Sequence, residues 1–172
     1  MQDFLTLAKE RYSVRQYKSD AVSKDDLAYI LEAAMIAPTA CNNQGIHVYV
    51  LSGEEARANA KSVCKFTFDA PVVLCVCKDS DKYWKNPFEE GVNSGDIDAS
   101  IVGSHMMLAA RERELGTCWV GAFSPSKLKE ALNLPQNHQP VLLMPLGHPA
   151  DEATPTAMHT TTRPQEELIT VM

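Results

Sequence analysis

The sequence contains no long hydrophobic run, and this absence is the first constraint on what the chain can be. Its apolar segments are all far shorter than the roughly 18 residues that a membrane-spanning helix needs. The N-terminal segment up to Arg15 also lacks the continuous apolar stretch that follows a basic start in a secretory signal. We therefore expect no secretory signal and no membrane as a partner.

The chain is also short of positive charge. It carries 16 Lys and Arg against 22 Asp and Glu, so its formal net charge is −6 and its pI is about 5.3. Domains that bind nucleic acid usually present a broad basic surface, so we expect no nucleic acid as a partner. A local basic pocket in an otherwise acidic surface is compatible with these numbers.

Cysteines are few and form no framework. There are five, an odd number, and their spacing does not match the patterns of disulfide-rich secreted domains. Cys75 and Cys77 alternate within an apolar run, which is typical of buried structural thiols and lacks the spacing of zinc ligands. The five histidines form no metal-ligand pattern either, so we expect no metal site. Reduced thiols indicate a cytoplasmic location.

The length and composition are those of an ordinary folded domain. The 172 residues are 45% hydrophobic and 22% charged, which is close to the globular average and far from a disordered composition. A chain of this size buries enough surface to fold without a disulfide or a metal. We predict a single domain over residues 1–172, with an extended tail over 150–172.

Hydrophobic periodicity and capping residues predict alternating helices and strands. The predicted helices cover roughly residues 4–12, 24–36, 54–64, 96–115 and 125–132. Apolar runs predict strands over 47–51, 71–77, 118–121 and 141–147. Residues 78–95 are polar and are predicted to form a loop or a mobile cover. This order predicts a three-layer α+β fold in which helices flank a central mixed or antiparallel sheet.

Two segments carry surfaces that one domain does not readily bury. Residues 99–110 are apolar nearly all round their helix, which predicts burial inside a core or against a second subunit. Residues 150–172 have too few apolar residues to form a core of their own. We expect this tail to wrap over another surface, that of a partner subunit.

Residues 11–15 and 37–45 combine residue types that suit a ligand, and each also has an ordinary structural explanation. Two arginines and a serine in 11–15 could hold an anion, because guanidinium groups match phosphate oxygens, or could form a solvated basic helix end. The carboxamides of 37–45 could match the polar edge of a heterocycle. The Pro, Asn and Gly residues of this loop are also usual in turns.

Residues 116–123 and Arg163 are open to two interpretations in the same way. Small residues in 116–123 would let a ring approach backbone N–H groups, although a buried strand followed by a helix cap explains them as well. Arg163 is isolated from other basic residues, and a lone arginine in a tail is usually a solvated charge.

The four segments, in this order and with this spacing, resemble the nitroreductase family of flavin mononucleotide (FMN) oxidoreductases. They read Arg11-Tyr12-Ser13-Val14-Arg15, Ala37-Pro38-Thr39-Ala40-Cys41-Asn42-Asn43-Gln44, Asp96 to Gly121, and Thr162-Arg163-Pro164. The resemblance covers nearly the whole chain. It implies a nitroreductase-like fold, a homodimer with FMN at the subunit interface, and NADH or NADPH as a transient electron donor.

The resemblance also implies roles for individual residues. Arg11, Ser13 and Arg163 would hold the FMN phosphate, and Arg15 would lie near the pyrimidine edge of the flavin. Further contacts to the flavin would come from the backbone of Tyr12, from Pro38, Thr39, Ala40 and Asn42 of the partner subunit, and along the ring from Val120, Gly121 and Ala122. No catalytic side chain is assigned, because the flavin itself carries the redox chemistry.

The sequence departs from the family pattern in three places. Gly45-Ile46 follows Gln44 where the family usually has Pro-Trp, Thr39 stands where Ser is commoner, and no Lys separates Arg163 from Pro164. Tyr83 and Trp84 are either a lid over the flavin or a surface aromatic pair.

The resemblance implies an enzyme that takes hydride from NAD(P)H onto flavin N5. Electrons would then pass to a nitroaromatic, a quinone or a similar small-molecule acceptor by a ping-pong mechanism. A fixed cation such as Arg15 would stabilise the negative charge of the reduced flavin. Two alternatives stay open: a related flavoenzyme with different chemistry (dehalogenation, enoate reduction or flavin fragmentation) and a non-catalytic FMN-binding protein.

Overall fold

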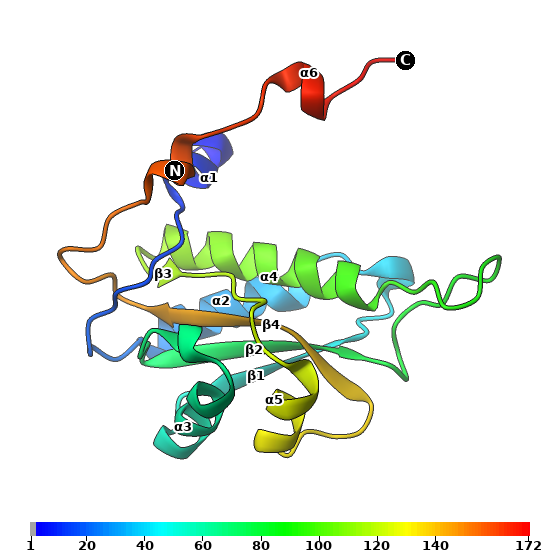
Figure 1. Ribbon diagram of the computed structural model, residues 1–172, viewed down its shortest axis with the longest axis horizontal. Coiled ribbons are helices and arrows are strands. Elements are labelled where there is room, and N and C mark those ends of the chain that lie inside the picture. Colours follow the sequence, from blue (N-terminus) through cyan, green and yellow to red (C-terminus); the bar gives the residue numbers. More distant parts are fainter. Residues whose placement is uncertain (1–2) are drawn as a thin grey trace.

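A computed structural model describes residues 3–172, and its centre is a four-stranded sheet with helices on both faces (Figure 1). In sheet order the strands are β1 (Ile46–Leu51), β2 (Val72–Asp79), β4 (His138–Gly147) and β3 (Gly116–Thr117). Each neighbouring pair of strands is antiparallel. The predicted layered α+β fold is therefore confirmed, and its sheet is antiparallel rather than mixed.

Each face of the sheet is covered by a pair of helices (Figure 1). On one side lie α2 (Lys24–Ile36) and α4 (Gly95–Glu112), and on the other lie α3 (Glu54–Val63) and α5 (Pro125–Ala131). The remaining helical segments are short: α1 (Phe4–Glu10), η1 (Ala40–Asn42), η2 (Lys65–Thr67), η3 (Ala157–Thr160) and α6 (Gln165–Leu168). No helix among residues 3–172 is both long and apolar enough to cross a bilayer.

Local signals in the sequence set the bounds of α2. The Ser23 hydroxyl accepts a hydrogen bond from the backbone N–H of Asp26 at 3.0 Å, which caps the first turn. The helix ends before Ala37, the residue that Pro38 excludes from helical angles. Both ends agree with the prediction.

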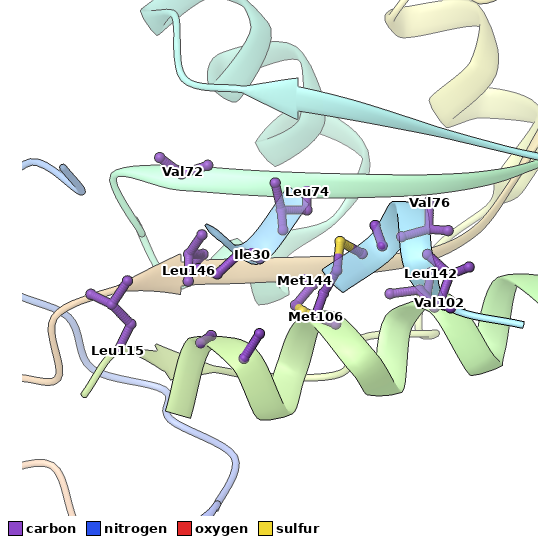
Figure 2. Close-up of a cluster of buried hydrophobic side chains, with 14 of the residues drawn as sticks. Ile30, Val72, Leu74, Val76, Val102, Met106, Leu115, Leu142, Met144 and Leu146 are labelled. Carbon is purple, nitrogen blue, oxygen red and sulfur yellow. The ribbon is translucent and has the colours of Figure 1, made fainter. Parts of the chain in front are cut away.

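Strand β2 is buried on both faces, as its continuous apolar run predicts. Alternate residues of a strand point to opposite sides, so Leu74 and Val76 face α2 and α4, and Cys75 and Cys77 face α3 and α5. Figure 2 shows the core between the sheet and α2 and α4, where Leu74 and Val76 pack with Ile30, Val102, Met106, Leu142 and Met144. The predicted burial of the two thiols is confirmed, and both cysteines are free.

The predicted strand over 118–121 is wrong in its position. The regular strand β3 covers only Gly116–Thr117. The next residue, Cys118, lies opposite Pro145 of β4, with a backbone N–O distance of 3.4 Å. Proline has no N–H to donate, so the ladder is interrupted here. It resumes only as an isolated bridge between Val120 and Leu143.

The tail was expected to be extended, and the structure places two short helical segments, η3 and α6, within it. From residue 161 onward every residue is exposed, and this part leads away from the sheet (Figure 1). Its contact with a partner subunit stays a prediction.

Candidate functional site

Residues 11–15 run in extended form beside the end of the sheet. The backbone N–H of Val14 donates to the carbonyl oxygen of Thr117 at 2.9 Å, and Ser13 forms a parallel bridge with Thr117. The Val14 side chain is buried against Gly116, where a Cβ atom would lie 2.6 Å from Val14 Cγ2. Because alternate residues of an extended chain point to opposite sides, buried Val14 leaves Ser13 and Arg15 on the accessible side.

Arg11, Ser13 and Arg15 line one cavity of about 270 Å³. The rest of its lining comes from Tyr12 and from the tail residues Thr156, Met158 and His159, so no residue that lines it is Asp or Glu. The structure thus brings two guanidinium groups and a hydroxyl together without a competing carboxylate. Such a donor set fits a phosphate group.

The tail closes one side of this arginine cavity. The Tyr12 hydroxyl donates to the carbonyl oxygen of Ala153 at 3.1 Å, and His159 Nε2 donates to the carbonyl oxygen of Lys9 at 2.9 Å. The rings of Tyr12 and His159 meet edge to face, with centroids 6.2 Å apart. Arg163 lies further along the exposed tail and does not line this cavity, so its assignment to the phosphate stays a prediction.

Two groups next to residues 11–15, the Cys118 thiol and the Tyr17 phenol, have raised pKa values. Burial raises the pKa of the Cys118 thiol, although Arg15, a hydrogen bond from Ser13 and Arg11 act in the opposite direction. Burial also raises the pKa of Tyr17, whose hydroxyl donates to the carbonyl oxygen of Val14 at 2.8 Å.

Residues 120–122 present free backbone donors. Val120 is buried and exchanges two hydrogen bonds with Leu143, at 2.9 and 3.0 Å, which fixes the backbone at that point. Gly121 and Ala122 follow on the surface, and within residues 3–172 their N–H groups donate to no other group. A Cβ atom on Gly121 would meet nothing within 4 Å. The open surface and the two free donors fit a flat ligand with acceptor atoms at its edge.

Trp119 anchors this segment to the middle of α4, and the prediction of site residues missed it. A Cβ atom on Gly103 would lie 2.9 Å from Trp119 Cζ3, so the indole rests in the notch that this glycine leaves. The signal was available, because a glycine inside a long apolar helix usually marks close packing.

The loop over 37–44 is held by a buried carboxylate. Asp98 of α4 accepts hydrogen bonds from the backbone N–H of Ala40 at 3.0 Å and from the Ser94 hydroxyl at 2.6 Å. Cys41 and Asn42 have positive φ angles of 52° and 53°, a conformation that costs energy in residues other than glycine and is found at binding loops. Sequence reasoning placed Asp98 only at a helix start and missed this role.

The loop and the arginines lie at opposite ends of α4. The loop is anchored at Asp98, and the arginine segment lies near Arg111, which pairs with Glu10 of α1 at 2.9 Å. At 1.5 Å per residue these two positions are about 20 Å apart along the helix. Within one chain, Pro38, Thr39, Ala40 and Asn42 are therefore not brought to the arginine cavity.

Comparison with known proteins connects these features to one family. A family model described as the nitroreductase family matches residues 8–65 and 56–148. A relative from Archaeoglobus fulgidus, named as a candidate NADH dehydrogenase or NAD(P)H nitroreductase, is 32% identical over 88% of each chain. The Bacillus subtilis protein named FMN reductase [NAD(P)H] is 28% identical over 89% of this chain and 68% of its own.

Solved structures give the same picture of the fold. A nitroreductase family protein from Clostridium difficile matches with a TM-score of 0.91 and 36% identity over 98% of both chains. A chain from Exiguobacterium sibiricum, solved in complex with FMN, matches with a TM-score of 0.83 at 23% identity, over 100% of this chain and 98% of its own.

Proposed function

Because this chain belongs to the nitroreductase family, we propose that it is an FMN-dependent oxidoreductase with NADH or NADPH as its electron donor. The observation that carries the proposal is the cavity in which Arg11, Ser13 and Arg15 converge without a carboxylate. The FMN in the Exiguobacterium sibiricum structure and the name of the Bacillus subtilis relative support the choice of cofactor.

The residues present fit both the phosphate and the ring of FMN. Arg11 and Ser13 would hold the phosphate, and the free N–H groups of Gly121 and Ala122 would face acceptor atoms of the ring. Bound FMN would supply the redox chemistry, taking hydride from the dinucleotide and passing electrons to a nitroaromatic, a quinone or a similar acceptor in ping-pong order.

The chain itself would contribute position and charge. The paired hydrogen bonds of Val120 and Leu143 hold the ring-facing donors in place, so no reorganisation is needed when charge develops. The Arg15 guanidinium would favour the additional negative charge of the reduced ring.

We further propose that the working unit is a homodimer. The loop over 37–44 is separated from the arginines by the length of α4, so its Pro38, Thr39, Ala40 and Asn42 would complete the site of a second chain. Hydrophobic side chains exposed near this helix are those that a partner would cover: Phe4, Leu5, Met35, Ile36 and Ile97. In the tail, Leu168, Ile169 and Val171 are exposed as well, which supports the proposal that the tail wraps the partner.

The test is an absorbance spectrum of the purified protein, before and after NADH or NADPH is added without air. We expect bound flavin that is bleached by the donor and restored by a quinone or a nitroaromatic compound. Protein that takes up no FMN would contradict the proposal. Flavin that binds but is reduced by neither donor would instead indicate a non-catalytic binding protein.

A further inference from the structure

A second donor-rich cavity, of about 340 Å³, lies between the start of α5 and the ends of β2 and β4. Its polar lining includes Lys78, Ser80, Ser126, Lys129, Asn137 and Gln139. Each of these side chains carries a hydrogen-bond donor, and no residue that lines the cavity is Asp or Glu. We call it the lysine cavity.

The absence of Asp and Glu from this lining is notable in a chain with a net charge of −6. Three other cavities each have Asp or Glu in their lining, namely Asp96 in one, Glu54 and Asp69 in the next, and Glu32 and Glu112 in the third. The lysine cavity shares the absence of a carboxylate with the arginine cavity. A lining with cationic side chains and without Asp or Glu suits an anion.

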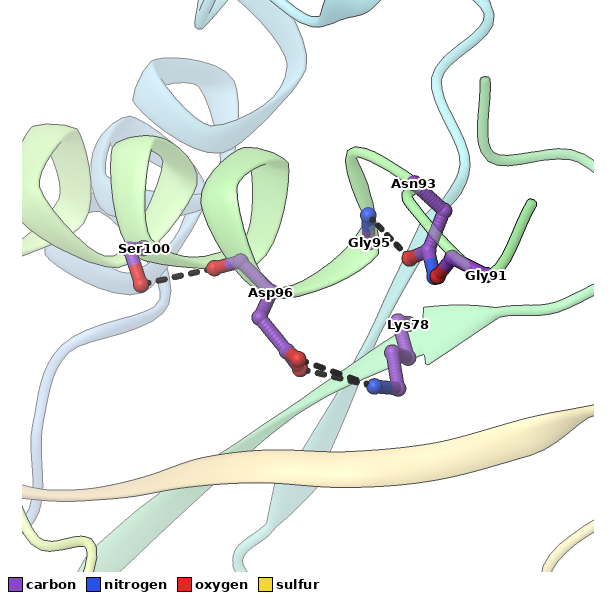
Figure 3. A network of polar contacts seen from close by, with 6 residues as sticks. All are labelled: Lys78, Gly91, Asn93, Gly95, Asp96 and Ser100. Carbon is purple, nitrogen blue, oxygen red and sulfur yellow. Dashed lines mark hydrogen bonds and ion pairs between the residues drawn. The ribbon is translucent and has the colours of Figure 1, made fainter. Parts of the chain in front are cut away.

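The two lysines differ in how their charge is balanced. The Lys78 ammonium donates to both carboxylate oxygens of Asp96, at 2.9 and 3.0 Å (Figure 3), so its charge is largely neutralised. Lys129 donates to the backbone carbonyl oxygen of Gln136 and, within residues 3–172, pairs with no carboxylate. Lys129 therefore supplies the uncompensated positive charge of the cavity.

The position of the cavity relates it to the candidate flavin site. Along α4 the arginine cavity lies near Arg111, Trp119 contacts Gly103, and Lys78 of the lysine cavity pairs with Asp96 in the first turn. Ser126 follows the ring-facing residues 121–122 closely in sequence, within roughly 18 Å even for a fully extended chain. The two carboxylate-free cavities thus lie on either side of the segment that would face the flavin ring.

From this arrangement we propose that the lysine cavity binds the phosphate groups of the nicotinamide dinucleotide donor. The inference rests on the proposed function. The nicotinamide must reach the flavin, and the diphosphate is only one ribose away from it, so the phosphates need a cationic site next to the ring and outside the arginine cavity. Lys129 would meet this charge, with the hydroxyls of Ser80 and Ser126 and the amide of Gln139 around it, whereas Asn137 Nδ2 already donates to Asp79 Oδ1 at 2.8 Å.

The experiment compares Lys129→Gln with Lys127→Gln in the full-length, FMN-loaded protein. Lys127 lies on the same helix, is exposed and does not line the cavity, so it is a matched control. With a neutral quinone as acceptor, we expect Lys129→Gln to raise KM for NADH and NADPH about tenfold, because a charge-assisted contact is lost. The kcat should change little, Lys127→Gln should behave as wild type, and Lys129→Arg should recover most of the affinity.

A direct binding measurement separates this inference from the proposed function. Calorimetric titration with tetrahydro-NADPH, which cannot give up hydride, should show a dissociation constant weakened about tenfold by Lys129→Gln. An unchanged dissociation constant, with the flavin still reduced by NADPH, would overturn the lysine site and leave the oxidoreductase function standing. A KM that rises only for an anionic acceptor such as a nitrobenzoate would also overturn it, because the cavity would then serve the acceptor. Flavin that neither donor reduces would count against the proposed function, and loss of analogue binding in Lys129→Gln would still support a phosphate site.

Discussion

The two ends of α4 hold candidate ligand-binding residues in different ways. At the Arg111 end, residues 11–15 are paired to the sheet and anchored by buried Val14, and the tail closes their cavity. At the Asp98 end, the loop over 37–44 depends on one buried carboxylate and presents its Asn42 to solvent. The first arrangement lies within one chain, whereas we propose that the second contributes to the site of a partner chain.

The largest effect on this contrast is expected from Asp98→Ala. The change leaves the half-buried N–H of Ala40 and the buried Ser94 hydroxyl without their acceptor, which costs about 3 kcal/mol of unfolding free energy. Asp98→Asn keeps one acceptor oxygen and should cost less. Chemical denaturation measures both. If the loop over 37–44 also contacts a partner chain, sedimentation should show weaker self-association for Asp98→Ala. Equal stability of the alanine variant and wild type would refute the anchoring role of Asp98.

Gly116→Ala tests the opposite end. The new Cβ would lie 2.6 Å from Val14 Cγ2 and 2.8 Å from Val14 Cβ, so the strand or the arginine segment must shift. We expect a loss of about 2 kcal/mol of stability from overpacking, together with weaker FMN binding. Gly53→Ala is the control, since a Cβ there meets nothing within 4 Å. Equal thermal unfolding of the two variants would contradict the packing argument.

Arg11→Ala sharpens the comparison, because it removes charge without disturbing the backbone pairing. Loss of a charge-assisted phosphate contact should weaken FMN binding by about 2 kcal/mol, or roughly thirtyfold. Fluorescence titration of the apoprotein measures this. Arg163→Ala should weaken FMN binding by a similar amount if the tail reaches the phosphate in the assembled dimer. An unchanged affinity for FMN would remove Arg163 from the site.

The smallest expected effect concerns pH. His47 follows the loop at the start of β1 and stacks on His138 with ring centroids 4.6 Å apart. Burial, His138 and Lys82 lower the pKa of His47, while Asp79 acts to raise it. The unfolded chain therefore binds a proton at about pH 6.5 that the folded chain binds only at lower pH.

Stability should accordingly fall as the pH drops below about 6.5. His47→Asn should flatten this part of the profile, measured as the midpoint of urea unfolding between pH 7 and pH 5. An identical pH profile in His47→Asn and wild type would contradict the assignment.

Part of the candidate site follows from the sequence and part does not. The types and spacing of Arg11, Ser13 and Arg15 are compatible with an anion site and with a solvated helix end, and the structure brings all three to one cavity. Asp98 and Lys129 were missed because their proposed roles depend on segments that are distant in sequence: the loop at Ala40 for Asp98, and the ends of β2 and β4 for Lys129. An acidic residue at a helix start and a lysine on a polar helix look ordinary until a distant loop is placed beside them.

The sequence by itself determined the local elements, because capping, proline effects and hydrophobic periodicity act over a few neighbouring residues. Ser23 and Pro38 bound α2, and the apolar run of β2 predicts burial on both faces. Only the tertiary structure decided that β3 stops opposite Pro145, that the sheet is antiparallel, and that the arginines and the loop lie about 20 Å apart. Strand pairing and packing depend on which distant segments meet, and a local sequence pattern does not specify which segment it will contact.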